Sequence, residues 1–328
     1  MKYLTSILLI LLSTTLLAQE KDWILDRFNL YSENDIFNGT DDSYSSGESF
    51  NFLYFIPEEN YMIYDLLGNK DVKTYSYFTF ALANQIFTPS DISETALMTT
   101  DRPYAGWTYL EMAIHKASKS ELRSLSLQLG MVGPSSYSDD FQNTVHRIIG
   151  SPRANGWSNQ LDNELGVNLK YTQKWRFQKE SSDYFESSII PFASSELGNV
   201  AINATTGFTT RIGWNIPKDF GVSSIDIGAD PGIPVYGEFK NMKKLPWSFS
   251  FNFTAAGSAV ARDIFLDGNT FERSHSVDKK TFVGYYGYGF TARYKNFVVD
   301  YMEIHNSKQF KTGKSNHAIG SLILSWLF

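Results

Sequence analysis

Segments in which apolar and polar residues alternate recur along the whole chain, and this pattern constrains the fold most. The clearest runs are Leu125, Leu127, Leu129 and Met131; Leu165, Val167, Leu169 and Tyr171; and Trp247, Phe249, Phe251 and Phe253. A period of two places successive side chains on opposite faces of a β-strand. Twelve strands are predicted, at residues 24–34, 44–55, 73–86, 105–116, 121–132, 164–176, 184–195, 205–215, 245–260, 281–294, 297–308 and 317–328. The chain is therefore expected to be all-β.

The last segment indicates how these strands are arranged. Residues 318–328 alternate in the same way, and the chain stops on the aromatic Phe328. Such a run resembles the closing strand of bacterial outer-membrane barrels, and an even count of strands about long enough to span a bilayer suits that class. We therefore expect a transmembrane antiparallel β-barrel of about twelve strands. The alternative is an ordinary C-terminal strand of a soluble sandwich.

The N-terminus and the composition narrow the class further. Lys2, followed by an apolar run at residues 7–12 and by Leu16-Leu17-Ala18, is typical of a secretory signal peptide, predicted at residues 1–18. Residues 19–328 would then form one barrel domain. The absence of cysteine excludes disulfides, thiol catalysis and cysteine-bound zinc. The net charge of −6, with no dense basic run, argues against a nucleic-acid partner.

Strand parity predicts which residues meet at the outer rim. With both termini on the periplasmic side, odd strands run outward and even strands return. The residues at outer strand ends and in outer loops then include Asn34, Asp35, Ser45, Arg102, Tyr104, His146, Trp157 and Glu164. The link at residues 216–244 is much longer than the short periplasmic turn that this topology requires, and an additional strand pair there is one alternative.

One outer loop carries a helical pattern, at residues 138–150. Ser138-Asp139-Asp140 is a typical helix start, and Gly150 is a natural stop. Phe141, Val145 and Ile148 share one face, which we expect to dock against the barrel wall. His146 would then be held rigidly at the rim, where a histidine of near-neutral pKa can serve as a general base. Alternatively, it is a loop histidine bonded to a neighbouring backbone group.

The remaining rim residues each have a structural and a functional interpretation. Asn34 and Asp35 are either turn formers or oxygen ligands for Ca²⁺. Ser45 is a strand-end hydroxyl. Arg102 either pairs with Asp101 or binds a lipid phosphate.

Glu164 and three aromatic residues are also predicted at the rim. Glu164 caps a strand, pairs with an arginine, or helps to bind a metal. Tyr104, Trp107 and Trp157 are typical of an interfacial aromatic girdle.

Several ordered blocks together resemble the outer-membrane lipid A 3′-O-deacylases. The blocks are Glu33-Asn34-Asp35-Ile36-Phe37, Thr40-Asp41, Tyr44-Ser45-Ser46-Gly47, Asp101-Arg102-Pro103-Tyr104-Ala105-Gly106-Trp107, Gly133-Pro134, Gln142-Asn143, His146-Arg147-Ile148-Ile149-Gly150, Gly156-Trp157, Gln160, Glu164 and Leu266-Asp267-Gly268-Asn269-Thr270-Phe271. The resemblance covers most of the mature chain and is densest before about residue 170.

The resemblance implies a twelve-stranded barrel with an external-loop helix against its wall and an active site between them. It implies Ca²⁺-dependent hydrolysis of the ester that holds the 3′-linked acyloxyacyl group of lipid A. His146 would be the base, with Asn34, Asp35 and Ser45 as further catalytic residues. Asn34, Asp35 and Glu164 are the candidate metal ligands, and Arg102, Tyr104 and Trp157 the candidate contacts to the lipopolysaccharide.

Two positions depart from the family pattern. Pro152 stands where some members carry a glutamate, and Asp42-Ser43 replaces a more usual arginine-containing pair. The expected protein is a monomeric, calcium-using enzyme of the bacterial outer membrane, surrounded by outer-membrane lipids. The alternatives are a phospholipase on the same barrel and a porin or other non-catalytic barrel.

Overall fold

The computed structural model describes residues 23–35, 43–57, 62–68, 74–179, 184–221, 223–225, 231–234, 245–313 and 317–328. Its strands are β1 (Ile24–Asn34), β2 (Ser43–Ile56), β3 (Tyr75–Thr88), β4 (Ala105–Ala117), β5 (Glu121–Val132), β6 (Glu164–Trp175), β7 (Phe177–Lys179), β8 (Phe185–Gly198), β9 (Ala201–Trp214), β10 (Trp247–Asp263), β11 (Phe282–Tyr294), β12 (Phe297–Asn306) and β13 (His317–Leu327). The predicted signal peptide lies outside the described residues.

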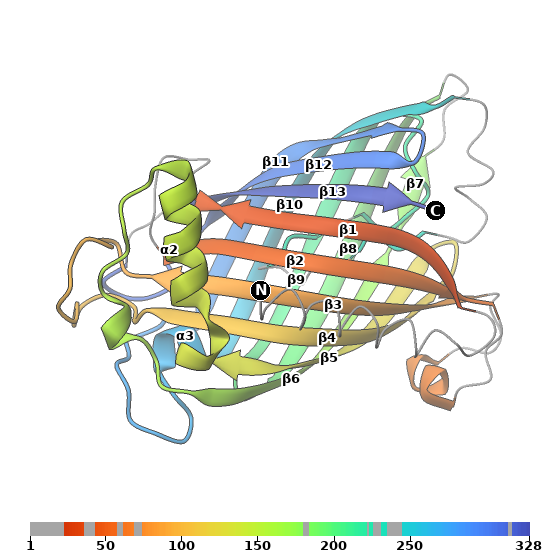
Figure 1. The fold of residues 1–328 in the computed structure, drawn as a ribbon. Helices are drawn as coiled ribbons and strands as arrows, with labels where there is room; N and C mark the ends of the chain where they lie inside the picture. Colours follow the sequence, from red (N-terminus) through yellow and green to blue (C-terminus); the bar gives the residue numbers. More distant parts are fainter. Residues whose placement is uncertain are drawn as a thin grey trace.

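All strands form one antiparallel sheet that closes on itself (Figure 1). Closure is made where β1 pairs with β13, with Arg27 opposite Leu327 and Asn34 opposite Gly320. Strands β6 and β7 lie end to end and both pair with β8, so the barrel wall is twelve strands around. The expected fold class is confirmed, and the first six strands differ from the predicted bounds by two residues or fewer.

Helices contribute little to the fold. They are α2 (Ser138–Ile149), α3 (Ile264–Asp267) and the 3₁₀ turns η2 (Met62–Leu67), η3 (Pro134–Ser136) and η4 (Trp157–Asn159). Among the described residues, no helix has the length and apolar character needed to cross a bilayer.

The predicted strand at 205–215 was too short, because β9 begins at Ala201 and its polar outer half hides the alternation.

Alternation gives the wall two chemically distinct faces. Large apolar side chains such as Leu165, Trp247 and Phe251 point outward and are more than half exposed. Polar side chains such as Asn51 and Thr79 point into the lumen and are fully buried. An apolar outer face with a polar interior is the pattern of strands that cross a bilayer.

The connection after β9 enters the lumen from its periplasmic end. Phe220 and Ile233 are buried against a lumen cluster that includes Leu53, Tyr77 and Leu122. The alternative of an additional strand pair is wrong for the described part of residues 216–244, where only isolated bridging such as Asp219 with Pro234 is formed. We call the described residues 216–221, 223–225 and 231–234 the lumen plug. Its length, too great for a turn, is explained by this inward course.

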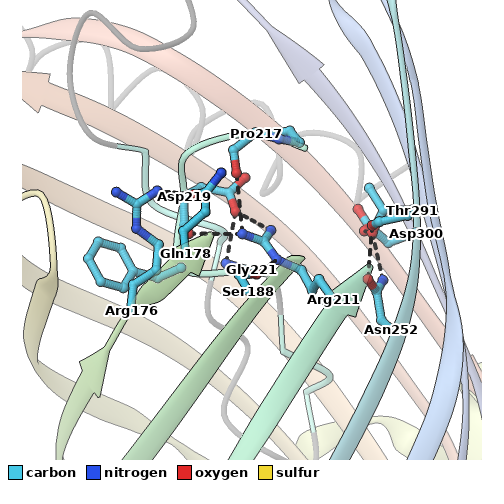
Figure 2. A network of polar contacts seen from close by, with 12 residues as sticks. Arg176, Gln178, Ser188, Arg211, Pro217, Asp219, Gly221, Asn252, Thr291 and Asp300 are labelled. Atoms are coloured by element: carbon cyan, nitrogen blue, oxygen red, sulfur yellow. Dashed lines mark hydrogen bonds and ion pairs between the residues drawn. The ribbon is translucent and has the colours of Figure 1, made fainter. Parts of the chain in front are cut away.

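A buried ion pair fixes the lumen plug to the wall (Figure 2). Arg211 of β9 donates from Nη1 to Asp219 at 2.5 Å and from Nη2 to the carbonyls of Pro217 and Asp219, at 3.2 and 3.1 Å. The Asp219 carboxylate also accepts from the backbone N–H of Gly221 at 3.0 Å. Both ends of the guanidinium are satisfied, as a charge removed from water requires.

Replacement of Asp219 by alanine should loosen the lumen plug. The substitution leaves the Arg211 guanidinium buried without its counter-charge, which costs about 3–5 kcal/mol of folding free energy. We expect a lower thermal unfolding midpoint and a higher ion conductance in planar bilayers. Asp278→Ala is the matched control, because it removes a carboxylate from a pair with Lys311 that is largely exposed. Unchanged conductance and stability in Asp219→Ala would show that this pair does not hold the plug.

Candidate functional site

Helix α2 lies outside the barrel wall at its outer end and packs on β3 and β4 (Figure 1). Its buried residues are Ser138, Gln142 and His146, which recur every four residues and face the wall. Phe141 and Ile148 are instead 41% and 76% exposed. The prediction that Phe141, Val145 and Ile148 dock on the wall is therefore wrong. On a membrane protein the apolar face of an outer helix need not be the one that faces protein.

The start of α2 is fixed by a close approach to the wall. The helix begins at Ser138, as the sequence predicted, and its N-cap is Tyr137 in a left-handed conformation. Asn84 of β3 donates from Nδ2 to Ser138 Oγ at 2.7 Å. A Cβ on Gly106 would lie 2.1 Å from the same oxygen, so glycine is required there.

Beneath α2 the outward face of the wall carries polar residues where lipid-facing positions would otherwise be apolar. Ser32, Glu48, Asn84 and Thr108 stand opposite one another on β1 to β4. Ser32 donates to Glu48 at 3.0 Å, and Asn84 donates to Thr108 at 2.7 Å. The part of the wall next to α2 is thus polar, and we call the interface between α2 and this part of the wall the wall–helix slot.

His146 faces this slot and is 5% exposed. Its Nδ1 lies 2.6 Å from the carbonyl oxygen of Pro152. Because a carbonyl can only accept, Nδ1 carries a proton, and Nε2 is the nitrogen that remains to act as a base. Gly150 ends the helix with φ 79°, as predicted, and turns the chain back toward His146. The backbone at position 152 thus orients the histidine, and a glutamate side chain is not needed for that.

Gln142 is a slot residue that the sequence analysis missed as a functional candidate. It lies one turn before His146 and is 3% exposed. Trp157 donates from Nε1 to Gln142 Oε1 at 2.8 Å, which directs the amide nitrogen away from Trp157. That nitrogen has no hydrogen-bond partner within the described part of the chain. The spacing of four residues from His146 on one helix was the available signal.

The predicted aromatic girdle is wrong for all three of its residues. We call the loop after α2, residues 150–156, the return loop. Tyr104 and Trp157 are buried in a cluster with Ile86, Ile92 and Ala154 of this loop, and their ring centroids lie 5.1 Å apart. Trp107 faces the lumen and stacks on Tyr109 at 4.0 Å. Tyrosine and tryptophan near a rim are typical of girdles, but here they pack loops onto the wall.

The end of β1 and the start of β2 carry oxygen-bearing side chains at the same rim. Asn34 is the last residue of β1 and stands opposite Ser46, while Asp35, directly after it, is fully buried. Ser45 Oγ lies 2.5 Å from Thr88 Oγ1. A bulge between Tyr44 and Ser46 leaves Ser45 as an extra residue in β2. Asn34, Ser45 and His146 therefore share the outward side of the wall at its outer end.

On the inner side of the wall, Glu33 ties these strand ends to the lumen plug. Its carboxylate accepts from Tyr44 Oη at 3.0 Å and from Ser321 Oγ at 2.8 Å. It also accepts from the backbone N–H of Ile225 in the plug at 2.8 Å. Glu33 immediately precedes Asn34, and Tyr44 immediately precedes Ser45, so one buried carboxylate fixes both strand ends.

Arg102 and Glu164 lie on the lumen side, apart from His146. Arg102 is 1% exposed, donates from Nη2 to Gln309 at 2.9 Å and lies over the ring of Phe87. Glu164 accepts from the backbone of Thr270 at 2.7 Å and from Asn199 Nδ2 at 2.7 Å. The structure thus places both residues among loop contacts at the mouth of the lumen.

The oxygen-bearing side chains at the end of β1 match the chemistry of Ca²⁺ better than that of a nitrogen- or sulfur-preferring metal. Within the described residues, no three or more His, Cys, Asp or Glu side chains gather as a metal site. Besides carboxylates, Ca²⁺ also uses neutral amide and hydroxyl oxygens, which Asn34 and Ser45 carry.

Comparison with known proteins identifies the family. The model of the family described as "Outer membrane protein LpxR" matches residues 4–328. The chain belongs to the LpxR family. LpxR from Salmonella typhimurium has a similar structure, with a TM-score of 0.74 at 17% identity, over 92% of this chain and 100% of that one. This confirms the resemblance inferred from the sequence and assigns the protein to the outer membrane.

Two further solved barrels match with TM-scores below 0.5. The β domain of the Bordetella autotransporter BrkA covers 93% of this chain and 98% of its own at 7% identity, with a TM-score of 0.39. The NanC porin covers 92% and 98% at 7% identity, with a TM-score of 0.34. No curated protein matches the chain.

Replacement of Glu33 by alanine should destabilise the rim. The substitution leaves three donors, from Tyr44, Ile225 and Ser321, buried without their acceptor, each at a cost of about 1–3 kcal/mol. We expect a markedly lower unfolding midpoint, measured by the loss of β-sheet circular dichroism on heating. Ser321→Ala removes only one of the three contacts and should shift the midpoint much less. Equal midpoints for the two variants would contradict the tie described above.

Proposed function

We propose that the protein is a calcium-dependent esterase that releases the 3′-linked acyloxyacyl group of lipid A in the outer leaflet. The observation that carries the proposal is His146, buried on the wall side of α2 with Nδ1 held by the Pro152 carbonyl. A histidine held in one tautomer beside a polar slot suits general-base catalysis. Membership of the LpxR family supports the choice of substrate.

The proposed reaction uses water as the nucleophile. His146 Nε2 takes a proton from water while the water oxygen attacks the carbonyl carbon of the ester. The resulting tetrahedral species collapses as the sugar oxygen leaves, and the protonated imidazole returns its proton to that oxygen. The products are a carboxylic acid and the free hydroxyl of lipid A. All the named groups come from one chain, so we propose that a monomer is active.

Gln142 supplies the hydrogen-bond donor that this reaction needs. Its buried amide nitrogen lies on the same face of α2 as His146 and has no partner among the described residues. A buried donor without a partner costs free energy in the resting protein and becomes useful when a substrate oxygen accepts from it. We propose that it donates to the ester carbonyl oxygen as negative charge develops there.

Asn34, Asp35 and Ser45 are the proposed holders of Ca²⁺. When bound, the ion would supply positive charge close to the carbonyl oxygen of the ester. The chain's part is to keep the oxygens in place, and Glu33 does so from the inner side of the wall. Glu164 is not proposed as a ligand, because its described contacts tie β6 to the loop that carries Asn269 and Thr270.

The location of the slot suits a lipid substrate. It lies on the outward side of the wall, at the outer end of the strands, where an outer-leaflet lipid can approach from the side. Arg102 and Tyr104 are buried. We therefore propose that headgroup recognition involves residues beyond the rim positions that the sequence highlights.

Replacement of His146 by glutamine should abolish the activity. Loss of a general base typically lowers the rate by about 10²–10⁴-fold. Outer membranes that contain the protein should release a 3′-acyl group from lipid A with Ca²⁺, as read by mass spectrometry, and chelation should prevent this. His305→Gln is the control, since that histidine stacks on Tyr286 of the distant strand β11. Full activity in His146→Gln would remove His146 from its proposed role.

The same assay separates the alternatives. Release of fatty acid from glycerophospholipids, but never from lipid A, would identify a phospholipase. Hydrolysis of neither substrate, together with ion conductance through the wild-type protein, would identify a porin. The lumen plug and α3 favour the esterase, because both pack side chains inside the lumen, where a porin needs an open channel.

Trp157→Phe should lower kcat without changing KM. Phenylalanine keeps a ring in the cluster with Tyr104 but loses the N–H that orients Gln142. Loss of one neutral hydrogen bond, worth about 1 kcal/mol, corresponds to roughly a fivefold lower kcat. Tyr104→Phe is the matched control, because its hydroxyl donates to the Ile92 carbonyl instead. A similar fall in both variants would indicate disturbed packing rather than a misdirected amide.

A further inference from the structure

Helix α2 has four flanks, and the described residues cover two of them. The first carries Ser138, Gln142 and His146 and faces the wall. The second carries Asn143, which exchanges hydrogen bonds with the backbone of Ala154 in the return loop, at 3.4 and 3.1 Å. The third carries Phe141, Val145 and Ile148, of which Phe141 and Ile148 are 41% and 76% exposed.

Helix geometry sets the direction of the third flank. At 3.6 residues per turn, Phe141 and Ile148 lie roughly 20° apart around the axis and roughly 140–160° from Asn143. The return loop that binds Asn143 lies beyond the outer ends of the strands, as Figure 1 shows. The third flank therefore points the opposite way, along the barrel toward the membrane.

The strand β4 on which α2 packs, and its neighbours β5 and β6, carry an apolar surface that already faces lipid. The outward residues of β4 to β6 that form this lipid-facing band are Met112, Leu129, Leu165, Val167 and Leu169, each at least 37% exposed. The axis of α2 runs across the strands (Figure 1), and hence along the plane of the membrane. Charged residues, Asp140 and Arg147, occupy the exposed side away from the wall.

This distribution is that of a helix that lies in a membrane interface, with its apolar flank among acyl chains and its charged side among headgroups. We propose that α2 is such a helix, and that Phe141, Val145 and Ile148 contact the acyl chains of outer-leaflet lipids. The helix then separates the wall–helix slot from the bilayer core. Resting on the proposed function, this surface would hold the slot at the depth of the ester bonds of its lipid substrate.

The absence of cysteine allows a direct test by site-directed spin labelling. A nitroxide is attached at Ile148→Cys or, as the matched control, at the neighbouring Arg147→Cys, in protein reconstituted into lipid vesicles. At position 148 we expect collisions with membrane-soluble oxygen to exceed those with a water-soluble nickel complex at least threefold. At position 147 we expect the reverse.

Two outcomes of the labelling would overturn the proposal. One is equal access of the nickel complex to positions 147 and 148, which would place the third flank in water. The other is dipolar broadening between labels on separate copies, which would make this flank a contact between two chains. Neither reading depends on catalysis, so a lipid-exposed label in a protein without esterase activity would count against the proposed function alone.

An activity measurement tests the consequence for the substrate. Phe141→Ser with Ile148→Ser should lower the hydrolysis of lipid A in bilayers about tenfold and leave that in detergent micelles within twofold. Asp140→Ser with Arg147→Ser has the same seven-residue spacing on the charged side and should leave both rates within twofold. An equal loss in bilayers and micelles would show that the apolar flank acts on the fold of the slot rather than on its position in the membrane.

Discussion

The closed sheet is the constraint on which the rest of the molecule depends. A bilayer core offers no water to unpaired backbone groups, so every strand needs a neighbour on both sides. Pairing of β1 with β13 meets this need, and it brings the two ends of the chain's β-structure together. Once the sheet is closed, each strand position faces either the lumen or the outside. The chemistry of the rim follows from that division.

The two faces of the wall have separate tasks at the outer end of β1. Glu33 faces inward and holds Tyr44, Ser321 and the lumen plug. Asn34, the next residue, faces outward toward the side where α2 lies. The strand β1 thus connects the buried contacts of the lumen with the side-chain oxygen of Asn34 on the outside of the barrel. The inner contacts are many and buried, which gives the outer group a rigid support.

Much of the fold could be predicted because the alternation of apolar and polar residues reports directly which face meets lipid. The strands before β7 were located closely, and the position of His146 at the outer rim follows from their parity. The inward course of residues after Trp214 could not be predicted. Its apolar residues, such as Phe220 and Ile233, show no regular spacing, and the residues they pack against lie on strands far away in sequence.

The candidate site was predicted in part, for a related reason. Residue types and family blocks indicated His146, Asn34, Asp35 and Ser45, whose chemistry is local. The orientation of α2 was wrong because a helical period identifies an apolar flank without saying whether protein or lipid covers it. Gln142 was missed because its significance comes from its contact with Trp157, which the spacing of four residues from His146 does not reveal by itself.

The bulge in β2 has a consequence for how this rim can vary. In a regular strand, neighbouring side chains alternate, so two successive hydroxyls cannot face the same side. The extra residue between Tyr44 and Ser46 interrupts this alternation at one point. Tyr44 therefore faces inward, while Ser45 and Ser46 both face the outside of the barrel. The number of residues in this short stretch therefore matters more than their identity. A deletion of one residue here would reverse the side that every residue beyond it faces.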